Sequence, residues 1–290
     1  MTSNAAGLNR PSEVHFLHSN ADVKTLEKSG SMPIAHGEGI YVFDLGGNRY
    51  FEAISGAWHL AFGFSEQRLI DAVNAQMARL PAYHAFFGRV GEPVLHLADR
   101  LSKIAPMPTG KVFFSHSGSE ANETAIKMLW LINWAEGQPA KRKVISRQCA
   151  YHGSTMLAAS LSGRDYIQAF GLPIDEILFA DIPHHWRYAE HGQSEEDYAT
   201  RLAGRLNDLI TRGDGSRLYR GSVHGGGRRG AAAALVVKIA FDHGLLLRPI
   251  VDSFVLAPPF ITSHRELDDM FAILETVMAK FRVSMERHTD

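Results

Sequence analysis

The sequence has few of the features that are typical of secreted or membrane-bound proteins. It contains a single cysteine, Cys149, so no disulfide can form within the chain, and a reducing compartment is expected. The first ten residues, MTSNAAGLNR, have no apolar segment of the kind that a signal peptide needs. No apolar run is long enough to cross a bilayer. We therefore expect a cytoplasmic protein.

An excess of charge of either sign is also absent. The chain has 30 lysines and arginines against 31 aspartates and glutamates, which gives a net charge of −1. Such a balance gives no reason to expect nucleic acid or an anionic membrane as a partner. With 290 residues, 45% of them hydrophobic, the chain is long enough for one large domain or two modest ones.

What is present is a series of strand and helix patterns. In the first 110 residues these are a hairpin with Gly46 and Gly47 at its turn, and helices over residues 65–80 and 92–104. The middle of the chain alternates strands at 111–114, 143–146 and 177–181 with helices at 118–134, after His152, and at 194–210. The last 60 residues contain a helix at 231–244, strands at 245–250 and 253–257, and a helix from Ser263 with a capping box to Glu266. Alternating strands and helices predict an α/β fold with a mostly parallel sheet.

The helix expected from Gly118 follows the small polar stretch Ser-His-Ser-Gly-Ser, residues 115–119. The start of a helix leaves backbone N–H groups unpaired and carries partial positive charge, so this stretch could form a cup for an anion such as phosphate. Ser117 and Glu120 also fit a capping box, which needs no ligand. On these residues alone, both interpretations stay open.

The stretch CAYHGST follows the next expected strand, which would bring Tyr151 and His152 near the same sheet edge as the cup. An aromatic side chain beside a phosphate site suggests that a flat cofactor ring stacks there. The alternative for Tyr151 is an aromatic residue packed at the end of a strand.

Several longer stretches resemble one protein family. They look like class III pyridoxal-phosphate aminotransferases, most of all the omega-transaminases that use pyruvate as acceptor. The stretches are HSGSEANETAIKMLW, AYHGSTMLAASLSG, FGLP, PHHWRY, YVFDLGGNRYFEAISGAWHLAFGFS and GLLLRPIVDSFVLAPPFITSHRELDDMF. The resemblance implies the α/β fold type I of these enzymes, with a small domain built from both chain ends. It also implies a homodimer that moves an amino group from an amine or amino acid to pyruvate or a similar keto acid.

The resemblance also implies roles for individual residues. Gly118 and Ser119 would hold the phosphate of pyridoxal 5'-phosphate, and Tyr151 would stack on its ring with His152 beside it. Trp58 and Phe86 would line the substrate pocket, and Arg248 would pair with a substrate carboxylate, which suits a guanidinium group. Without the resemblance, we would expect Trp58 to pack in the core and Arg248 to be a cation on the surface.

The residues that would complete the chemistry are missing from the expected place. In the family, the Schiff-base lysine and the acid that faces the pyridine nitrogen lie between the counterparts of Ile210 and Ala233. Here that interval is TRGDGSRLYRGSVHGGGRRGAA, which has no lysine. None of six lysines elsewhere follows a strand in the way that would aim an amine at the cofactor, namely Lys103, Lys111, Lys127, Lys141, Lys143 and Lys238.

We therefore predict an internally deleted member of the family with an incomplete large domain. The predicted segments are 1–60 as part of the small domain, 61–212 as half of the large domain, 213–232 as a joint and 233–290 as the rest of the small domain. A non-catalytic remnant that pairs with an intact relative is one alternative. Another enzyme of the same fold type, an aminomutase or decarboxylase, is a second, although it would need the same lysine.

Two further patterns are weak. GGGRRG, residues 225–230, matches a dinucleotide-binding fingerprint with Asp252 about twenty residues further on, but no convincing strand precedes the glycines. His184, His185 and His191 lack the spacing of metal ligands, so no metal is expected.

Overall fold

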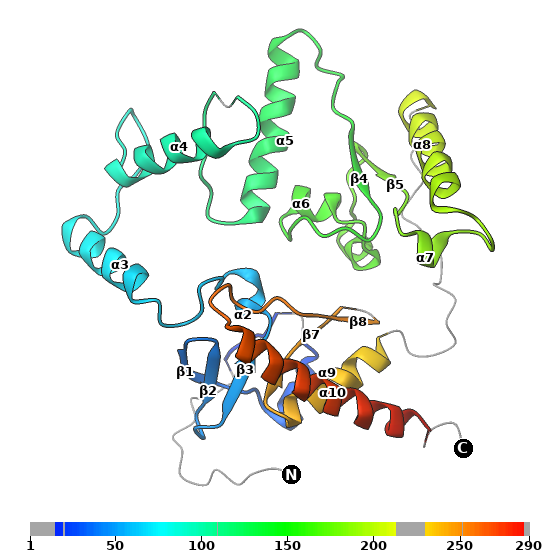
Figure 1. Cartoon of the computed structure of the whole chain (residues 1–290). Helices are drawn as coiled ribbons and strands as arrows, with labels where there is room; N and C mark the ends of the chain where they lie inside the picture. The colour runs from blue at the N-terminus through cyan, green and yellow to red at the C-terminus, as the bar shows by residue number, and fades with distance from the viewer. Residues whose placement is uncertain (1–14, 20, 109, 213–229, 251, 287–290) are drawn as a thin grey trace. The chain divides into compact units, whose positions relative to one another are not determined.

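The computed structural model describes residues 15–19, 21–108, 110–212, 230–250 and 252–286 (Figure 1). The chain divides into two compact units. Unit 1 comprises Met1–Gly91 and His224–Asp290, and unit 2 comprises Glu92–Val223. Both ends of the chain thus belong to unit 1. The boundaries drawn from the sequence at 60/61 and 232/233 stay predictions, and most of the expected joint at 213–232 lies outside the described residues.

Unit 1 contains a four-stranded sheet in the order β1-β2-β3-β6. Its strands are β1 (Ile34–Glu38), β2 (Tyr41–Asp44), β3 (Arg49–Glu52) and β6 (Leu245–Leu246). β1, β2 and β3 pair antiparallel, and β6 pairs parallel to β3, with Phe51 opposite Leu245. The hairpin expected around the two glycines is therefore confirmed, and a strand from the far end of the chain extends its sheet.

The remaining elements of unit 1 are helices and two short strands, and the last two of these helices cover the sheet. They are α1 (Val23–Ser29), α2 (Ser55–Trp58), α3 (Gln67–Arg79), α9 (Ala231–Asp242), β7 (Arg248–Ile250), β8 (Ser253–Val255) and α10 (His264–Glu286). β7 and β8 form a small antiparallel ladder. Apolar residues of β3, β6, α9 and α10 form one buried cluster, which includes Phe51, Leu245, Met270 and Val277. The sheet and the two long helices are held together by this core.

The start of α10 confirms the expected capping box. The amide of Glu266 donates to Ser263 Oγ at 3.3 Å, and the amide and hydroxyl of Ser263 donate to Glu266 Oε2 at 2.8 and 2.6 Å. Both partners satisfy groups that the helix start would otherwise leave unpaired.

Unit 2 is built from helices around a short parallel sheet (Figure 1). Its elements are α4 (Glu92–Ile104), α5 (Gly118–Ala135), β4 (Val144–Arg147), α6 (Met156–Leu161), the 3₁₀ helix η1 (Asp165–Phe170), β5 (Ile177–Ala180), α7 (His185–Tyr188) and α8 (Glu195–Arg212). β4 and β5 pair parallel, as the α/β pattern predicted. Their core includes Ile126 of α5, Leu157 of α6, and Ile177 and Phe179 of β5.

The strand expected at 111–114 was wrong. This segment has no regular structure, and Phe113 and Phe114 are 70% and 40% exposed. A strand forms only when a neighbour satisfies its backbone groups, and residues 111–114 pair with neither outer edge of β4-β5, the described sheet of unit 2. The apolar composition of the segment predicts a strand, but its partner would have to come from elsewhere in the chain.

The surface of α5 carries an unusual number of apolar side chains. Five large ones are exposed over its second half, namely Met128, Leu129, Leu131, Ile132 and Trp134. A helix that is apolar on most sides is ordinarily covered by other elements. The expectation that the sheet and its covering helices are incomplete stays a prediction. Among the described residues, no helix is long and apolar enough to cross a membrane.

Candidate cofactor and substrate site

The first part of the candidate site is the start of α5. Ser117 has extended backbone angles, φ −150° and ψ 160°, and its Oγ accepts the amide of Glu120 at 3.2 Å. The carboxyl group of Glu120 in turn accepts the amide of His116 at 2.8 Å. The helix is thus capped by Ser117 as expected, while Glu120 reaches one residue further back than in a standard capping box.

The cap does not use every donor at this helix start. Within the described part of the chain, the amides of Gly118 and Ser119 donate to no acceptor. A Cβ placed on Gly118 would meet no atom within 4 Å, so the space in front of these amides is open. Two free N–H groups at the positive end of an 18-residue helix can receive an oxyanion.

The segment that follows β4 is fastened to this helix start by three hydrogen bonds. The amide of Ser154 donates to Ser119 Oγ at 3.1 Å, and Asn122 Nδ2 donates to the carbonyl of His152 at 2.7 Å. The amide of Leu157 donates to Glu123 Oε1 at 3.2 Å. The hydroxyl hydrogen of Ser119 stays available beside the two free amides, because its oxygen acts as acceptor in the bond to Ser154.

The structure therefore brings Tyr151 and His152 to the start of α5. Tyr151 is 61% exposed, with the guanidinium of Arg164 5.8 Å from its ring centroid. The amide of His152 donates to the hydroxyl of buried Ser162 at 2.9 Å, which fixes the backbone under the tyrosine. The exposed ring can take a flat partner on its face, which a tyrosine packed in the core could not do.

Gly153 permits this close approach, and the sequence reading did not single it out. Its φ is +132°, and a Cβ on it would lie 2.5 Å from Ser119 Oγ and 2.8 Å from Ala158 Cβ. Its place between His152 and Ser154 in the stretch YHGS is the only signal that the sequence offers. Without glycine at this position, Ser119 and the 151–154 segment could not lie together.

We expect Gly153→Ala to lower the free energy of unfolding of unit 2 by about 1–3 kcal/mol, because of backbone strain and the clash with Ser119. Gly204→Ala in α8 is the matched control, since a Cβ there meets no atom within 4 Å. That control should be neutral or stabilise the helix by about 0.5–1 kcal/mol. Urea denaturation of both variants checks the difference, and equal effects would contradict the described packing of Gly153.

The second part of the candidate site lies in unit 1, at α2. The four residues from Ser55 to Trp58 all have positive φ, between 48° and 73°, so α2 is a single left-handed turn. Only Gly56 adopts such angles at no cost, and each of the other three costs about 1–2 kcal/mol. Strain of this kind persists only where the surrounding structure determines the conformation, and it is concentrated at functional positions.

The turn presents Trp58 to Arg248. The guanidinium carbon of Arg248 lies 4.6 Å from the centroid of the indole ring, and the indole is 49% exposed. Among the described residues, no carboxyl group forms an ion pair with Arg248. A stacked guanidinium keeps its N–H edge free for two parallel hydrogen bonds to a carboxylate. Core packing of Trp58 is thereby excluded, while its role in a substrate pocket stays a prediction.

The structure does not bring the third substrate residue into this pair. Phe86 is 68% exposed, and its ring neighbours are His84 and Phe87, with centroids 6.1 and 6.3 Å away. Its assignment to the substrate pocket stays a prediction.

The lysines are the side chains that could supply the amine expected by resemblance. All nine lie in the described part of the chain and are exposed. Three have partners, since Lys103 pairs with Asp99, Lys143 donates to the carbonyl of Asp175 and Lys280 contacts His243. Within unit 2, no lysine forms a hydrogen bond with the cup or with the 151–154 segment. The expectation that the Schiff-base lysine is missing stays a prediction.

Glu52 is a buried acid that the sequence reading missed. It ends β3, is 8% exposed, and its Oε1 accepts the amide of Ile54 at 3.0 Å. Burial raises the pKa of its carboxyl group, against smaller lowering effects from the amides of Ile54 and Gly56 and from nearby His59. Alternation along β3 places Glu52 on the face opposite to that of Phe51, so the period of the strand alone does not predict its burial.

This raised pKa predicts a pH dependence of stability. An acid with a higher pKa in the folded chain binds more protons there, so its contribution is fully present below the unfolded pKa of about 4.5 and is lost as pH rises through the folded pKa. We expect the stability difference between Glu52→Gln and wild type to shift in favour of the variant as pH rises through this window. Urea denaturation between about pH 4 and 8 measures it, and parallel curves would contradict it.

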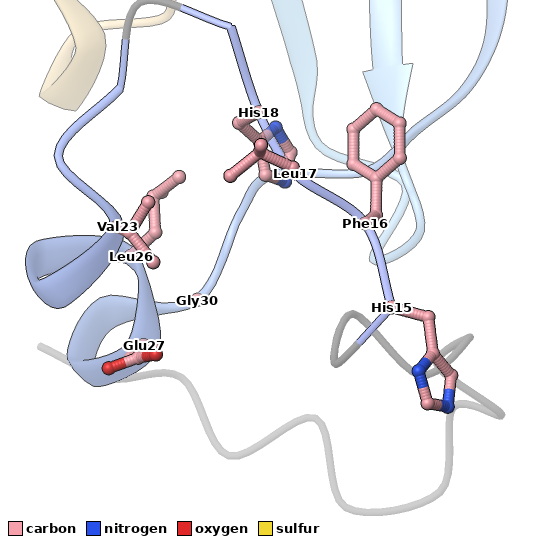
Figure 2. Close-up of a pocket in the computed structure, with 8 residues that line it drawn as sticks. All are labelled: His15, Phe16, Leu17, His18, Val23, Leu26, Glu27 and Gly30. Carbon is pink, nitrogen blue, oxygen red and sulfur yellow. The ribbon is translucent and has the colours of Figure 1, made fainter.

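Other patterns lead to no site. Among the described residues, no group of three or more His, Cys, Asp or Glu side chains could hold a metal. Most of GGGRRG lies outside the described residues, while Gly230 donates its amide to Asp252 Oδ1 at 2.7 Å. A hollow of about 450 Å³ lies in unit 1. Figure 2 shows residues that line it, among them Leu17 and His18, and Val23 and Leu26 of α1. No residue expected to act in catalysis or binding lines it.

Comparisons with known proteins agree with the geometry. The family model described as Aminotransferase class-III matches residues 25–215. Gamma-aminobutyrate transaminase 1, mitochondrial, from Oryza sativa subsp. japonica is 46% identical over 179 residues, which cover 61% of this chain and 35% of that protein. Vanillin aminotransferase from Capsicum annuum is 45% identical over 179 residues, which cover 61% of this chain and 39% of that protein. The chain thus spans 35–39% of the length of these two relatives.

Solved structures extend the likeness to both units. The pyridoxamine-phosphate-bound (PMP-bound) aminotransferase from Vibrio fluvialis superposes with a TM-score of 0.85 at 25% identity, covering 95% of this chain and 99% of that chain. A thermostable omega transaminase mutant from Pseudomonas jessenii is 45% identical, with a TM-score of 0.66, over 69% of this chain and 45% of that chain. The identity of 45% applies to the shorter overlap, which covers 69% of this chain.

Proposed function

The chain belongs to the class III aminotransferases, whose cofactor is pyridoxal 5'-phosphate, and on this premise we propose that unit 2 holds the cofactor's phosphate at the start of α5. Its fold is the α/β fold type I of pyridoxal-phosphate-dependent transferases. The observation that carries the proposal is the pair of unpaired amides at Gly118 and Ser119, next to the Ser119 hydroxyl. These donors suit the oxygens of a phosphate.

The neighbouring residues fit the rest of a flat, phosphorylated cofactor. The exposed ring of Tyr151 offers a stacking face, and its backbone is fixed by the bond between His152 and Ser162. The carboxyl groups of Glu120 and Glu123 are occupied by backbone amides of His116 and Leu157. When bound, the cofactor supplies a ring that withdraws electrons from the carbon bearing the amino group. The chain's own part is to bind the phosphate and to orient that ring.

For the substrate we propose Trp58 and Arg248 as the carboxylate receptor. The guanidinium has no ion-pair partner among the described residues, and the indole holds it by stacking. The two relatives are a gamma-aminobutyrate transaminase and a vanillin aminotransferase, which supports an amine or amino acid as donor and pyruvate or a similar keto acid as acceptor. We also propose that the chain forms a homodimer, as the family resemblance implies.

Catalysis by this chain alone is proposed to be impaired. A lysine that acts on the substrate carbon must lie within hydrogen-bond reach of it, whereas the described lysines are exposed and those of unit 2 form no hydrogen bond with the cup. A non-catalytic chain that pairs with an intact relative fits this observation. An aminomutase or a decarboxylase would need the same amine. The exposure of the lysines therefore argues equally against these two activities.

Binding of pyridoxamine 5'-phosphate to the full chain tests the proposal. This probe has no aldehyde, so it cannot bond to surface lysines, and equilibrium dialysis against pyridoxamine isolates the contribution of the phosphate. We expect the phosphorylated compound to bind at least about tenfold more tightly, and Gly153→Ala to weaken it, since each tenfold step corresponds to about 1.4 kcal/mol. Equal binding of the two compounds would refute the phosphate cup.

A further inference from the structure

We propose that Glu52 is a positioning residue, which holds the left-handed turn Ser55–Trp58 and thereby sets the indole of Trp58 against the guanidinium of Arg248. Glu52 touches neither side chain of that pair directly. It ends β3, where its amide donates to the carbonyl of Ile40 at 3.0 Å and its backbone pairs with Leu246 of β6. The residue therefore lies at a fixed point of the sheet, three residues before the first residue of the turn, Ser55.

The first step is the link between the carboxyl group and the turn. It accepts the amide of Ile54 at 3.0 Å, so it holds the backbone immediately before the turn. Inside the turn, the amide of Trp58 donates to the carbonyl of Ile54 at 3.0 Å. A strained run with three non-glycine residues at positive φ needs such outside partners to persist.

A second anchor joins the turn to the part of the chain that carries Arg248. The hydroxyl of Ser55 is buried and donates to the carbonyl of Ala257 at 2.6 Å, and the amide of Ala257 donates to the carbonyl of Ala53 at 2.7 Å. Ala257 follows β8, and β8 pairs with β7, whose first residue is Arg248. The two anchors therefore fix both members of the stacked pair in one frame.

The consequence is a guanidinium held in one orientation before any ligand arrives. Its carbon lies 4.6 Å from the indole centroid, and an orientation fixed in advance lowers the entropy lost on binding a carboxylate. The inference rests on the proposed function in one respect, because the role of this pair in substrate binding is part of that proposal. The positioning by Glu52 can be measured without cofactor, substrate or activity.

The experiment uses the full chain labelled with 5-fluorotryptophan. The four tryptophans give separate ¹⁹F resonances, and Trp58→Phe assigns the one of interest. The variants are Glu52→Ala, which removes both acceptors, Glu52→Gln, which keeps one, and Ser55→Ala, which removes the second anchor. Glu38→Ala is the matched control, because Glu38 is an exposed glutamate on β1 of the same sheet. Phenylglyoxal labelling with peptide mapping reports the accessibility of Arg248 in each variant.

We expect Glu52→Ala to move the Trp58 resonance toward that of a solvent-exposed indole and to raise the labelling rate of Arg248 about threefold or more, the loss expected for a cation–π contact. Glu52→Gln and Ser55→Ala should give intermediate changes, and Glu38→Ala none. Resonances of Trp130, Trp134 and Trp186, which lie in unit 2, should stay in place in all variants.

A purely structural role for Glu52 would give a different result. The variants would then melt at lower temperature while the Trp58 resonance and the Arg248 labelling rate of the folded protein stayed at wild-type values, and the proposal would be overturned. If Glu52→Ala does not fold, the isosteric Glu52→Gln and the second-anchor variant Ser55→Ala decide the question. Failure of pyridoxamine phosphate to bind would refute the phosphate cup in unit 2 and leave these two readouts unaffected.

Discussion

Treatment of the full chain with pyridoxal phosphate and then with borohydride is expected to leave no adduct on any single preferred lysine. The nine lysines are all exposed, and those of unit 2 form no hydrogen bond with the start of α5 or with the segment around Tyr151. Covalent catalysis demands placement of the amine at the reacting atom as well as its presence. Scattered, low-level labelling of several surface lysines is the expected peptide map.

We also expect the rate of amino transfer by this chain to be low. A positioned acid–base group contributes about 10²–10⁴-fold to such a rate, so the chain should be slower than an intact class III enzyme by at least that factor. The control adds excess pyridoxamine 5'-phosphate before reduction, which should not change the labelling of surface lysines. A single labelled lysine that this competitor protects would overturn the expectation and restore the active-enzyme interpretation.

Leu245→Ala is expected to lower the free energy of unfolding of unit 1 by about 2–5 kcal/mol, the usual cost of removing a buried leucine. Leu245 is fully buried on β6 and packs in the cluster with Met270 and Val277. It also stands opposite Phe51 in the parallel ladder, so its loss opens a cavity between the sheet and the helices that cover it. Thermal and urea denaturation measure the change.

Leu69→Ala is the matched control for this core variant. Leu69 lies on α3 in the same unit and is 51% exposed, so the same truncation should cost no more than about 0.5 kcal/mol. The two variants change the same atoms and differ in burial alone. Equal effects would mean that the two chain ends do not share a core in solution.

The sequence identified those elements whose causes are local. The helix expected over residues 92–104 is α4, Glu92–Ile104, because its apolar period requires no information from elsewhere in the chain. The cap at Ser263 and the helix start at Gly118 follow in the same way from the chemistry of a few adjacent residues. The cup is therefore a feature that short-range rules can find.

Elements that depend on a distant partner could not be found in this manner. The apolar stretch 111–114 reads as a strand, yet it forms none, since it pairs with neither outer edge of β4-β5, the described sheet of unit 2. The left-handed turn at 55–58 contradicts the backbone preferences of Ser55, Ala57 and Trp58. It persists through contacts with Glu52 and with Ala257, which is 202 residues away from Ser55 in the chain.

The sequence by itself thus determined the α/β family, the capped helix start at Gly118 and the absence of a lysine between residues 211 and 232. Tertiary structure alone decided that Trp58 and Arg248 meet, that Glu52 is buried, and that Gly153 lies against Ser119. The physical reason is distance along the chain. Helix periodicity and capping act within a few residues, whereas burial, stacking and strand pairing depend on which remote segments fold against each other.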